Sequence, residues 1–329
     1  MASVPHVRAA ETRFRHALAV VSFAALLVYW ATSGYFGKEI IAEIAIFAIL
    51  AIALDLVAGY AGMVSLGHGA LLGFGAYIFA LIAVLWGLSG GLAMLGACLA
   101  TGLIALAMGA VVSRVHGIFF IMATLAIGEM GYEYFFQSKT FGGDDGFAGI
   151  PRLDLSWLGL DSNDPAVFAL CLILLLAVIY ILVARLLGSP YGWALVGLHE
   201  NERRMRALGL PNRLYKTSII AVSGLIAGLA GALSAMHTQF ITPQLLHWTT
   251  SGEVLIMVIL GGLGTLVGPV IGAAIVVLLR HQLSSYTDYW GFWLGAFLIL
   301  VVLSRGNGVV GWLYLLWQRL LRARGHAEG

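Results

Sequence analysis

Of the ionisable side chains within the long apolar runs of this 329-residue sequence, six are best placed to do chemistry. They are Glu43, Asp55, His68, Glu129, Glu133 and Glu253. If these runs cross a membrane, a charge at the bilayer centre costs about 2.5–3.5 kcal/mol, so each group should face the protein interior or a wet cavity, or lie near a span end. Glu133 and Glu253 lie near span ends, where hydration is a sufficient explanation.

His68 is the most informative of the six because it lies in Ser65-Leu66-Gly67-His68-Gly69, where a helix is expected to break. A lone histidine is more often a hydrogen-bonded structural residue than a ligand, and this interpretation stands beside a functional one. The sequence has neither His-His nor His-Glu spacing for zinc, and no second histidine four residues on for haem. We therefore predict no metal site.

The sequence also lacks the common catalytic motifs. It contains no G-x-S-x-G, no H-E-x-x-H and no phosphate-binding loop. We therefore predict no catalytic residues and no enzyme activity. If ATP drives this protein, another subunit must bind it.

The composition explains why the ionisable groups are so few. Apolar residues make up 60% of the chain and charged residues 10%, whereas a soluble domain carries about 25% charged residues. With Lys+Arg 18 against Asp+Glu 16 there is no basic excess for nucleic acid. Cys98 and Cys171 both lie in apolar runs and are expected to be free thiols. These features exclude a soluble globule and indicate an integral membrane protein.

A spanning helix needs about 20 mostly apolar residues. Suitable runs lie at 17–35, 39–58, 64–86, 91–112, 117–136, 166–187, 217–237, 253–280 and 289–304. The run 253–280 fits either one tilted span or two short segments, and 309–321 fits either a last span or an amphipathic surface helix. The sequence predicts an all-α, polytopic transmembrane bundle of eight to ten spans with broken helices. We divide it into an N-terminal segment 1–16, a transmembrane domain 17–306 and a C-terminal tail or last span 307–329.

Charge bias predicts the orientation of the bundle. Arg8, Arg13 and Arg15 precede the first run, which is too long for a signal peptide and is followed by further spans. Basic loops face the cytoplasm, so both the N-terminus and the arginine-rich C-terminus are expected there. Loop 188–216 is rich in arginine and should be cytoplasmic, whereas loop 137–165 carries five aspartates and should face outward, into the periplasm.

Two segments of the chain resemble each other. Residues 54–69 and 256–269 each combine an apolar helix, a G-x-x-G break and a small-residue stretch that opens the next helix. Matching breaks in two halves indicate a transport pathway, although glycine is also common in membrane helices. Both a parallel and an inverted repeat remain open. The break glycines are Gly59, Gly62, Gly261, Gly264 and Gly268, and we expect the pathway to be lined by Met63, Ser65, His68 and Thr265.

The end of loop 188–216 carries the signals of a short helix. Asn201 is a good N-cap, Glu202 suits the first turn, Arg206 suits the last, and Gly209 is a natural stop before Pro211. Two turns of helix are not stable alone in water, so this one must dock on the bundle or on a cytoplasmic partner. The candidate docking residues are Glu200, Asn201, Glu202, Arg203, Arg206, Leu208 and Gly209.

Three stretches resemble the permease subunits of the branched-chain amino acid class of ABC importers. The first runs from Gly59-Tyr60-Ala61-Gly62 through Gly67-His68-Gly69 to Gly75-Ala76-Tyr77. The second is Thr124-Leu125-Ala126 followed by the segment 142–151, and the third joins the loop 200–209 to Gly261-Gly262-Leu263-Gly264-Thr265 and Gly268-Pro269. The resemblance covers nearly the whole chain, in order. Met63 departs from a position that is often a polar amide in this family, and Asp55 from one that is often uncharged.

The resemblance implies the second (M-type) of two unlike permeases in the bacterial inner membrane. It implies a coupling role for the loop helix, two ATP-binding subunits that use ATP and magnesium, and a periplasmic binding protein that selects the solute. The chain itself would bind no cofactor. The solute would be a branched-chain amino acid or a related amide, urea or organic acid.

The competing prediction is an ion-coupled secondary transporter. Such a protein needs a buried carboxylate relay, for which Asp55, Glu43 and Glu129 are candidates. It has no need of a capped helix presented to the cytoplasm, which favours the importer. A membrane-embedded enzyme is disfavoured because no set of acid, base or metal ligands converges.

Overall fold

The protein is helical throughout the residues that the computed structural model describes, which are 5–153, 161–287, 289–303 and 308–325. The first half contains α1 (Pro5–Thr32), α2 (Tyr35–Asp55), α3 (His68–Ala80), α4 (Gly90–Val112) and α5 (Ile118–Gln137). α2 and α3 each continue as a π-helical turn, Leu56–Tyr60 and Leu81–Leu85. Two 3₁₀ turns, Lys139–Phe141 and Gly143–Asp145, follow α5. The all-α prediction is confirmed.

The second half begins with α6 (Pro165–Leu187), α7 (Pro190–Glu200), α8 (Glu202–Ala207) and α9 (Asn212–Thr238). A 3₁₀ turn at Pro243–Leu246 leads to α10 (Trp248–Gly261), α11 (Val267–Tyr286), α12 (Trp290–Leu303) and α13 (Gly308–Gly325). A short antiparallel pair joins β1 (Phe147–Ala148) to β2 (Phe240–Ile241), with Phe147 opposite Ile241. The pair ties the predicted outer loop to the segment after α9.

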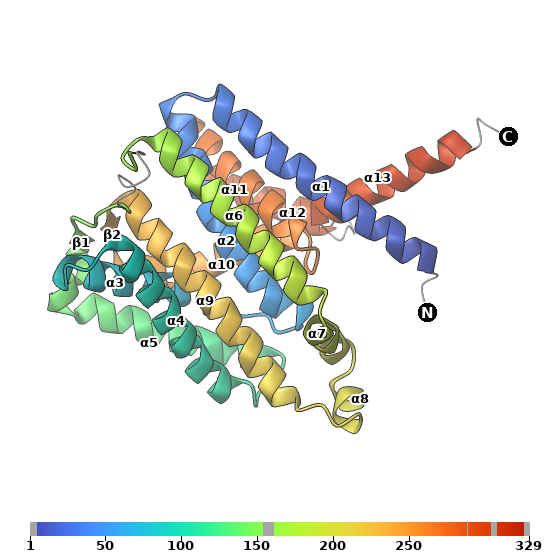
Figure 1. The fold of residues 1–329 in the computed structure, drawn as a ribbon, viewed down its shortest axis with the longest axis horizontal. Coiled ribbons are helices and arrows are strands. Elements are labelled where there is room, and N and C mark those ends of the chain that lie inside the picture. Colours follow the sequence, from blue (N-terminus) through green and yellow to red (C-terminus); the bar gives the residue numbers. More distant parts are fainter. Residues whose placement is uncertain (1–4, 154–160, 288, 304–307, 326–329) are drawn as a thin grey trace.

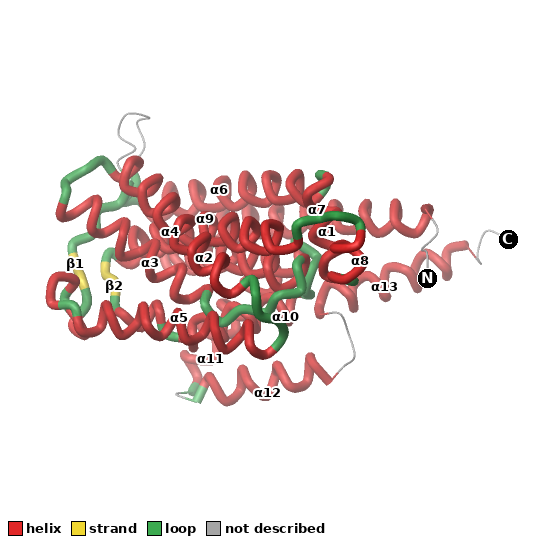
Figure 2. The backbone as a smooth tube through the Cα atoms, turned by 90° about the horizontal axis from the view of Figure 1, so that it is seen from below, coloured by secondary structure: helices red, strands yellow, loops and turns green. Residues whose placement is uncertain are grey.

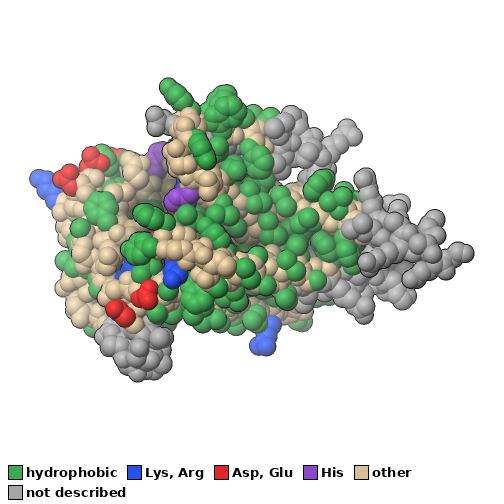
Figure 3. All heavy atoms as spheres, turned by 90° about the horizontal axis from the view of Figure 1, so that it is seen from above, with side chains coloured by type: hydrophobic (Ala, Val, Ile, Leu, Met, Phe, Trp, Pro, Cys, Tyr) green, Lys and Arg blue, Asp and Glu red, His purple; other side chains and the backbone are tan. Residues whose placement is uncertain are grey.

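Within the described residues, seven helices are long and apolar enough to cross a membrane: α2, α3, α4, α5, α6, α9 and α11, with α2 and α3 counted together with their π-helical turns. The apolar part of α1 (Ala17–Thr32) and the whole of α10 are shorter. The run 253–280 is therefore two helices, α10 and α11, separated by a break at 262–266. Hydrophobic side chains predominate over the middle of the molecule, and charged ones gather toward the end that holds β1 and β2 (Figure 3).

The two ends of the bundle carry different elements. The start of α1 and the end of α13 lie at the end that carries α7 and α8, and β1 and β2 lie at the opposite end, in both ribbon views (Figures 1 and 2). Both termini and loop 188–216 are therefore on one side, and the acidic loop is on the other. This arrangement agrees with the predicted sidedness of the loops relative to one another.

α2 is the core of the bundle, with every residue from Ile44 to Ala58 buried except Phe47. It is surrounded by α6, α9, α10 and α11. α9 in turn packs closely on α4 through Gly224 and Gly228, because a Cβ at either glycine would collide with Thr101 or Ala105. The four-residue spacing of these glycines places both on one face of α9, where they allow close helix packing.

Candidate functional site

The two helix breaks of the sequence repeat lie against each other. The backbone of Gly59, at the end of α2, is so close to that of Gly264 that neither position has room for a side chain without displacement. Gly62 and Gly264 have φ +70 and +69, a left-handed conformation that favours glycine. The second break also contains Leu266 at φ +59, which is unfavourable for a branched side chain.

Asp55 joins the two breaks. This fully buried carboxylate on α2 accepts hydrogen bonds from the backbone N–H of Gly264 at 2.7 Å and of Leu266 at 3.3 Å. Hydrogen bonds to a charged acceptor are stronger than neutral ones. Asp55 therefore offsets two costs of the break: backbone N–H groups without helical partners, and the unfavourable positive φ of Leu266. The sequence nominated Asp55 only for a proton relay, whereas its contacts are those of a structural clamp.

At the first break, Ser65 and His68 form a buried hydrogen-bond chain. The Ser223 hydroxyl donates to the carbonyl of Ala53 at 2.6 Å, so it accepts from His68 Nε2 at 2.8 Å. His68 Nδ1 then accepts from the Ser65 hydroxyl at 3.2 Å, and Ser65 also accepts from the N–H of Gly67 at 3.2 Å. Every polar atom in this chain has a partner, which fits the structural interpretation of His68.

At the second break, Thr265 precedes α11 and organises its start. Its hydroxyl donates to the carbonyl of Gly262 at 2.7 Å and accepts from the N–H of Gly268 at 3.0 Å. The backbones of Gly261 and Gly268 are in direct contact, which leaves no room for a Cβ at either position. Thr265, predicted to line the pathway, and the break glycines Gly261 and Gly268 therefore form one compact turn.

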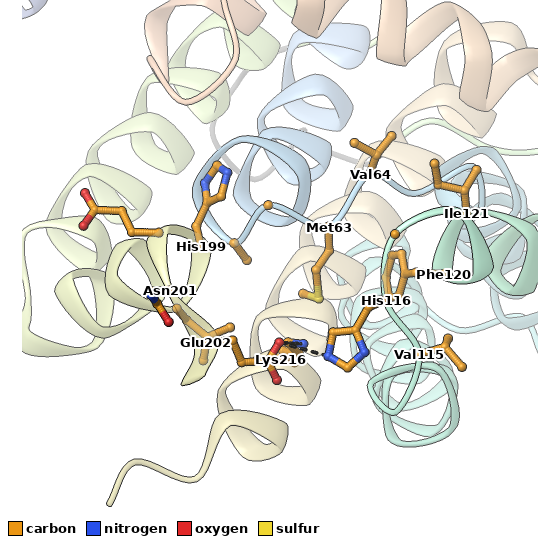
Figure 4. A pocket seen from close by; sticks show the side chains of 15 residues that line it. Met63, Val64, Val115, His116, Phe120, Ile121, His199, Asn201, Glu202 and Lys216 are labelled. Carbon is orange, nitrogen blue, oxygen red and sulfur yellow. Dashed lines mark hydrogen bonds and ion pairs between the residues drawn. The ribbon is translucent and has the colours of Figure 1, made fainter. Parts of the chain in front are cut away.

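A cavity of about 280 Å³ opens beside the first break. It is bounded by Met63 and Val64 of that break, by the turn between α4 and α5, by the α7–α8 junction and by Lys216 of α9 (Figure 4). The predicted pathway residue Met63 lines this cavity, together with Glu200, Asn201 and Glu202 of the predicted docking loop.

The predicted loop helix is present as α8, with both predicted caps. Asn201 Oδ1 accepts from the N–H of Arg204 at 3.0 Å. At the other end Gly209 has φ +83, its N–H donates to the carbonyl of Arg206, and the N–H of Leu210 donates to that of Met205. This is a Schellman motif, in which the left-handed residue lets the last carbonyls find donors.

Glu202 holds α8 against the bundle. Its carboxylate contacts Lys216 Nζ at 2.7 Å and His116 Nε2 at 2.9 Å (Figure 4), and Arg206 at 3.5 Å one turn later. Partial burial opposes ionisation of this carboxyl, but the hydrogen bond and charge of Lys216, with the contribution of His116, hold the pKa of Glu202 below its ordinary value. Arg203, Arg206 and Leu208 nevertheless remain exposed to solvent, Leu208 by 70%.

α7 carries the contact from α8 to the first break. Met205 of α8 packs on Gly197, and the ring of His199 fills the space where a Cβ of Gly62 would lie. The sequence did not predict α7, although Ser189-Pro190, an N-cap residue followed by proline at the first helical position, was a readable signal.

A second charged cluster also escaped prediction. Arg280 on α11 contacts Glu253 on α10 at 2.8 Å and pairs with Glu43 on α2, and Glu43 contacts His281 at 2.7 Å. Glu43 and Glu253 are therefore paired rather than merely hydrated. Nothing in the sequence gives the distance between α2 and α11, so only the structure reveals the pairing. Among the described residues, no three His, Cys, Asp or Glu side chains are grouped to hold a metal ion.

Comparisons with known proteins identify the fold family. The family model described as a permease component of branched-chain amino acid transport systems matches residues 37–302. The high-affinity branched-chain amino acid transport system permease protein LivM of Escherichia coli (strain K12) is 29% identical over 316 residues, covering 89% of this chain and 74% of that protein. The protein of the same name from Salmonella typhimurium is 29% identical over 287 residues, covering 80% and 68%. No solved structure gives a significant match.

Proposed function

The chain belongs to the family of branched-chain amino acid transport permeases, and on this premise we propose that it forms half of the route by which an ABC importer moves branched-chain amino acids. It is a multi-pass membrane permease component, not itself a catalytic enzyme. The substrate class is supported by the names of the two LivM relatives, each of which aligns over more than two thirds of its length.

The observation that carries the proposal is α8. A two-turn helix is capped at both ends, anchored to the bundle by Glu202 and left exposed at Arg203, Arg206 and Leu208. Such a helix presents a rigid surface without contributing to the bundle core. We propose that it is the coupling helix, which docks in a groove of an ATP-binding subunit. Asn201 and Gly209 cap its ends, and the exposed Glu200 lies just before the N-cap.

The geometry supports a route for conformational change from α8 to the breaks. Movement of α8 would act through Met205 on α7, and through His199 on the loop at Gly62 and Met63. Asp55 would pass the change to the second break through Gly264. In this proposal Met63 lines the pathway, and Ser65, His68 and Thr265 shape it by fixing the backbone of the breaks rather than by offering free hydroxyls.

The remaining partners and the location follow from the family. We propose an unlike second permease, two ATP-binding subunits that hold ATP and magnesium, and a periplasmic binding protein, with no cofactor bound by this chain. We also propose the bacterial inner membrane, with both termini and α8 in the cytoplasm. The common location of the termini and α8 at one end of the bundle supports this orientation (Figure 1).

An ion-coupled secondary transporter is not favoured. The family match does not support it, and two of the three carboxylates nominated for a relay hold the structure together: Asp55 clamps the breaks and Glu43 pairs with Arg280 and His281.

Co-purification tests the proposal. The tagged chain, extracted from native membranes in a mild detergent, should bring down a second permease and an ATP-binding subunit. Replacement of Leu208 by Asp should release the ATP-binding subunit and leave the second permease bound. If the wild-type chain brings down neither protein, the importer proposal is wrong.

A further inference from the structure

α5 is the least covered of the seven spanning helices. In its most apolar window 28% of residues are buried, against 39% to 83% in the other six. It packs on α3, on α4 and on the turn Pro243–Leu246, and it lies along the edge of the bundle (Figure 1). Most of its surface therefore faces outward, toward whatever surrounds this chain in the membrane.

The exposed stripe of α5 differs from those of its neighbours because it carries two carboxylates. The stripe, which we call the α5 face, consists of the exposed Phe119, Met122, Ala126, Met130 and Glu133, each three or four residues from the next, with the half-buried Glu129 beside them. By contrast, the exposed large side chains of α4 include Leu92, Leu95, Leu99 and Leu103, and those of α6 are Leu174, Val178, Ile181 and Leu182. The stripes of α4 and α6 suit acyl chains, whereas the α5 face does not.

Glu129 lies near the middle of the apolar helix α5. It is the twelfth of the 20 residues of α5, about 16 Å along a helix of about 30 Å. Its Oε1 accepts from the N–H of Trp248, the first residue of α10, at 3.0 Å. One backbone donor does not replace the hydration of a carboxylate, so the half-exposed Glu129 needs further donors from outside this chain.

We propose that the α5 face is the docking surface of the second, unlike permease subunit. The inference rests on the proposed function, because it takes the second permease from there. Lipid tails offer no donor to Glu129, and a water-soluble partner does not reach mid-membrane depth. Among the proposed partners only the second permease spans the membrane. Its facing helix supplies hydrogen-bond donors or a cation opposite the two carboxylates.

This position gives the interface a connection to the breaks. Glu129 holds the first residue of α10, and α10 runs from there to Gly261 at the second break. A shift of the second subunit against the α5 face would therefore act on α10 directly, without passing through the core helix α2.

Site-specific photo-crosslinking tests the inference. A benzoylphenylalanine side chain replaces Met122 or Met130 in the complete complex, in native membranes. The matched control is Leu99 on α4, which is exposed by 61% against 72% for Met130 and lies at a similar distance from its own helix end. After irradiation, Met122 and Met130 should give an adduct with the second permease, identified by mass spectrometry, and Leu99 should give none.

Three results would overturn the inference: an adduct with lipid alone, an adduct with a second copy of this chain, or an equal yield from Leu99. Failure of the proposed function gives a different result: the tagged wild-type chain would bring down no second permease at all. As a second measurement, Glu129→Leu should lose the second permease on extraction, while Glu129→Gln, which keeps hydrogen-bonding capacity, should retain part of it. Full retention by Glu129→Leu contradicts the role given to this carboxylate.

Discussion

Replacing Glu202 by Gln should release α8 from the bundle. The variant keeps the size of the side chain but removes the charge that faces Lys216, whose side chain is 4% exposed, and His116. Hydrogen bonds between charged groups contribute about 1.5–3 kcal/mol, and breaking a buried pair costs about 3–5 kcal/mol. Because Glu202 is 24% exposed and partly screened, we expect a cost of about 2 kcal/mol, or roughly 30-fold in the docking equilibrium.

Hydrogen exchange measures this cost directly. The amide hydrogens of Met205, Leu208 and Leu210, which are bonded within or just after α8, should exchange roughly 30-fold faster in Glu202→Gln than in the wild type. Glu200→Gln is the matched control, since it removes the same charge from an exposed position two residues earlier, at the end of α7, and should leave exchange unchanged. Equal protection of α8 in Glu202→Gln and wild type would refute the anchoring role of Glu202.

Hydrogen exchange in α8 should become faster at acidic pH, because the anchor depends on the ionised form of Glu202. The pKa of Glu202 is lower in the folded protein than its ordinary value of 4.5, so its ionised form is favoured by folding. The stabilisation is fully present above pH 4.5 and is lost as the pH falls through the lowered pKa. Protection of α8 that persists unchanged well below this range would contradict the assignment.

Four further predictions concern other positions. Gly209→Val should cost about 1–2 kcal/mol at φ +83 and weaken assembly with the ATP-binding subunit, whereas Gly209→Asn, which tolerates this conformation, should assemble normally on co-purification. Asp55→Asn places an amide donor against backbone N–H groups and should cost about 2–3 kcal/mol of stability. The purified variant should unfold at a lower temperature and the complex should lose uptake. A wild-type unfolding temperature and wild-type uptake would refute the role of Asp55 as a clamp. A cysteine that replaces Asn163 should react with an impermeant thiol reagent in intact spheroplasts, whereas a cysteine that replaces the exposed Leu208 should not. The reverse labelling pattern would show that the proposed orientation in the membrane is wrong. Ser65→Ala, His68→Leu and Thr265→Val should each reduce uptake at normal abundance, because each removes a hydrogen bond that fixes a break, and normal uptake by all three would reduce them to packing residues.

Local signals made α8 and the helix breaks predictable. Asn201 and Gly209 act through bonds to residues at most four positions away, so their types and spacing specify the caps without knowledge of the fold. The same holds for the breaks, where glycines at positive φ interrupt apolar runs. The close packing of α9 also has a local basis, because Gly224 and Gly228 lie four residues apart on one helix face.

Contacts between distant parts of the chain were not predictable. Asp55 and Gly264 are 209 positions apart, and Glu43 and Arg280 are 237 apart, so no periodicity relates them. An isolated carboxylate in an apolar helix is compatible with a relay, a clamp or an ion pair until its neighbours are known. The hydroxyls of Ser65 and Thr265 show the same limit, since the sequence could not reveal that both are engaged by the backbone of their own turns.

ATP-driven uptake by the reconstituted complex is the most direct test of the proposed function. The co-purified complex is placed in proteoliposomes with ATP inside, and radiolabelled leucine is added outside with the periplasmic binding protein. We expect uptake that requires both ATP and the binding protein and that a proton or sodium gradient does not replace. Uptake driven by such a gradient without ATP would contradict the importer and restore the secondary transporter.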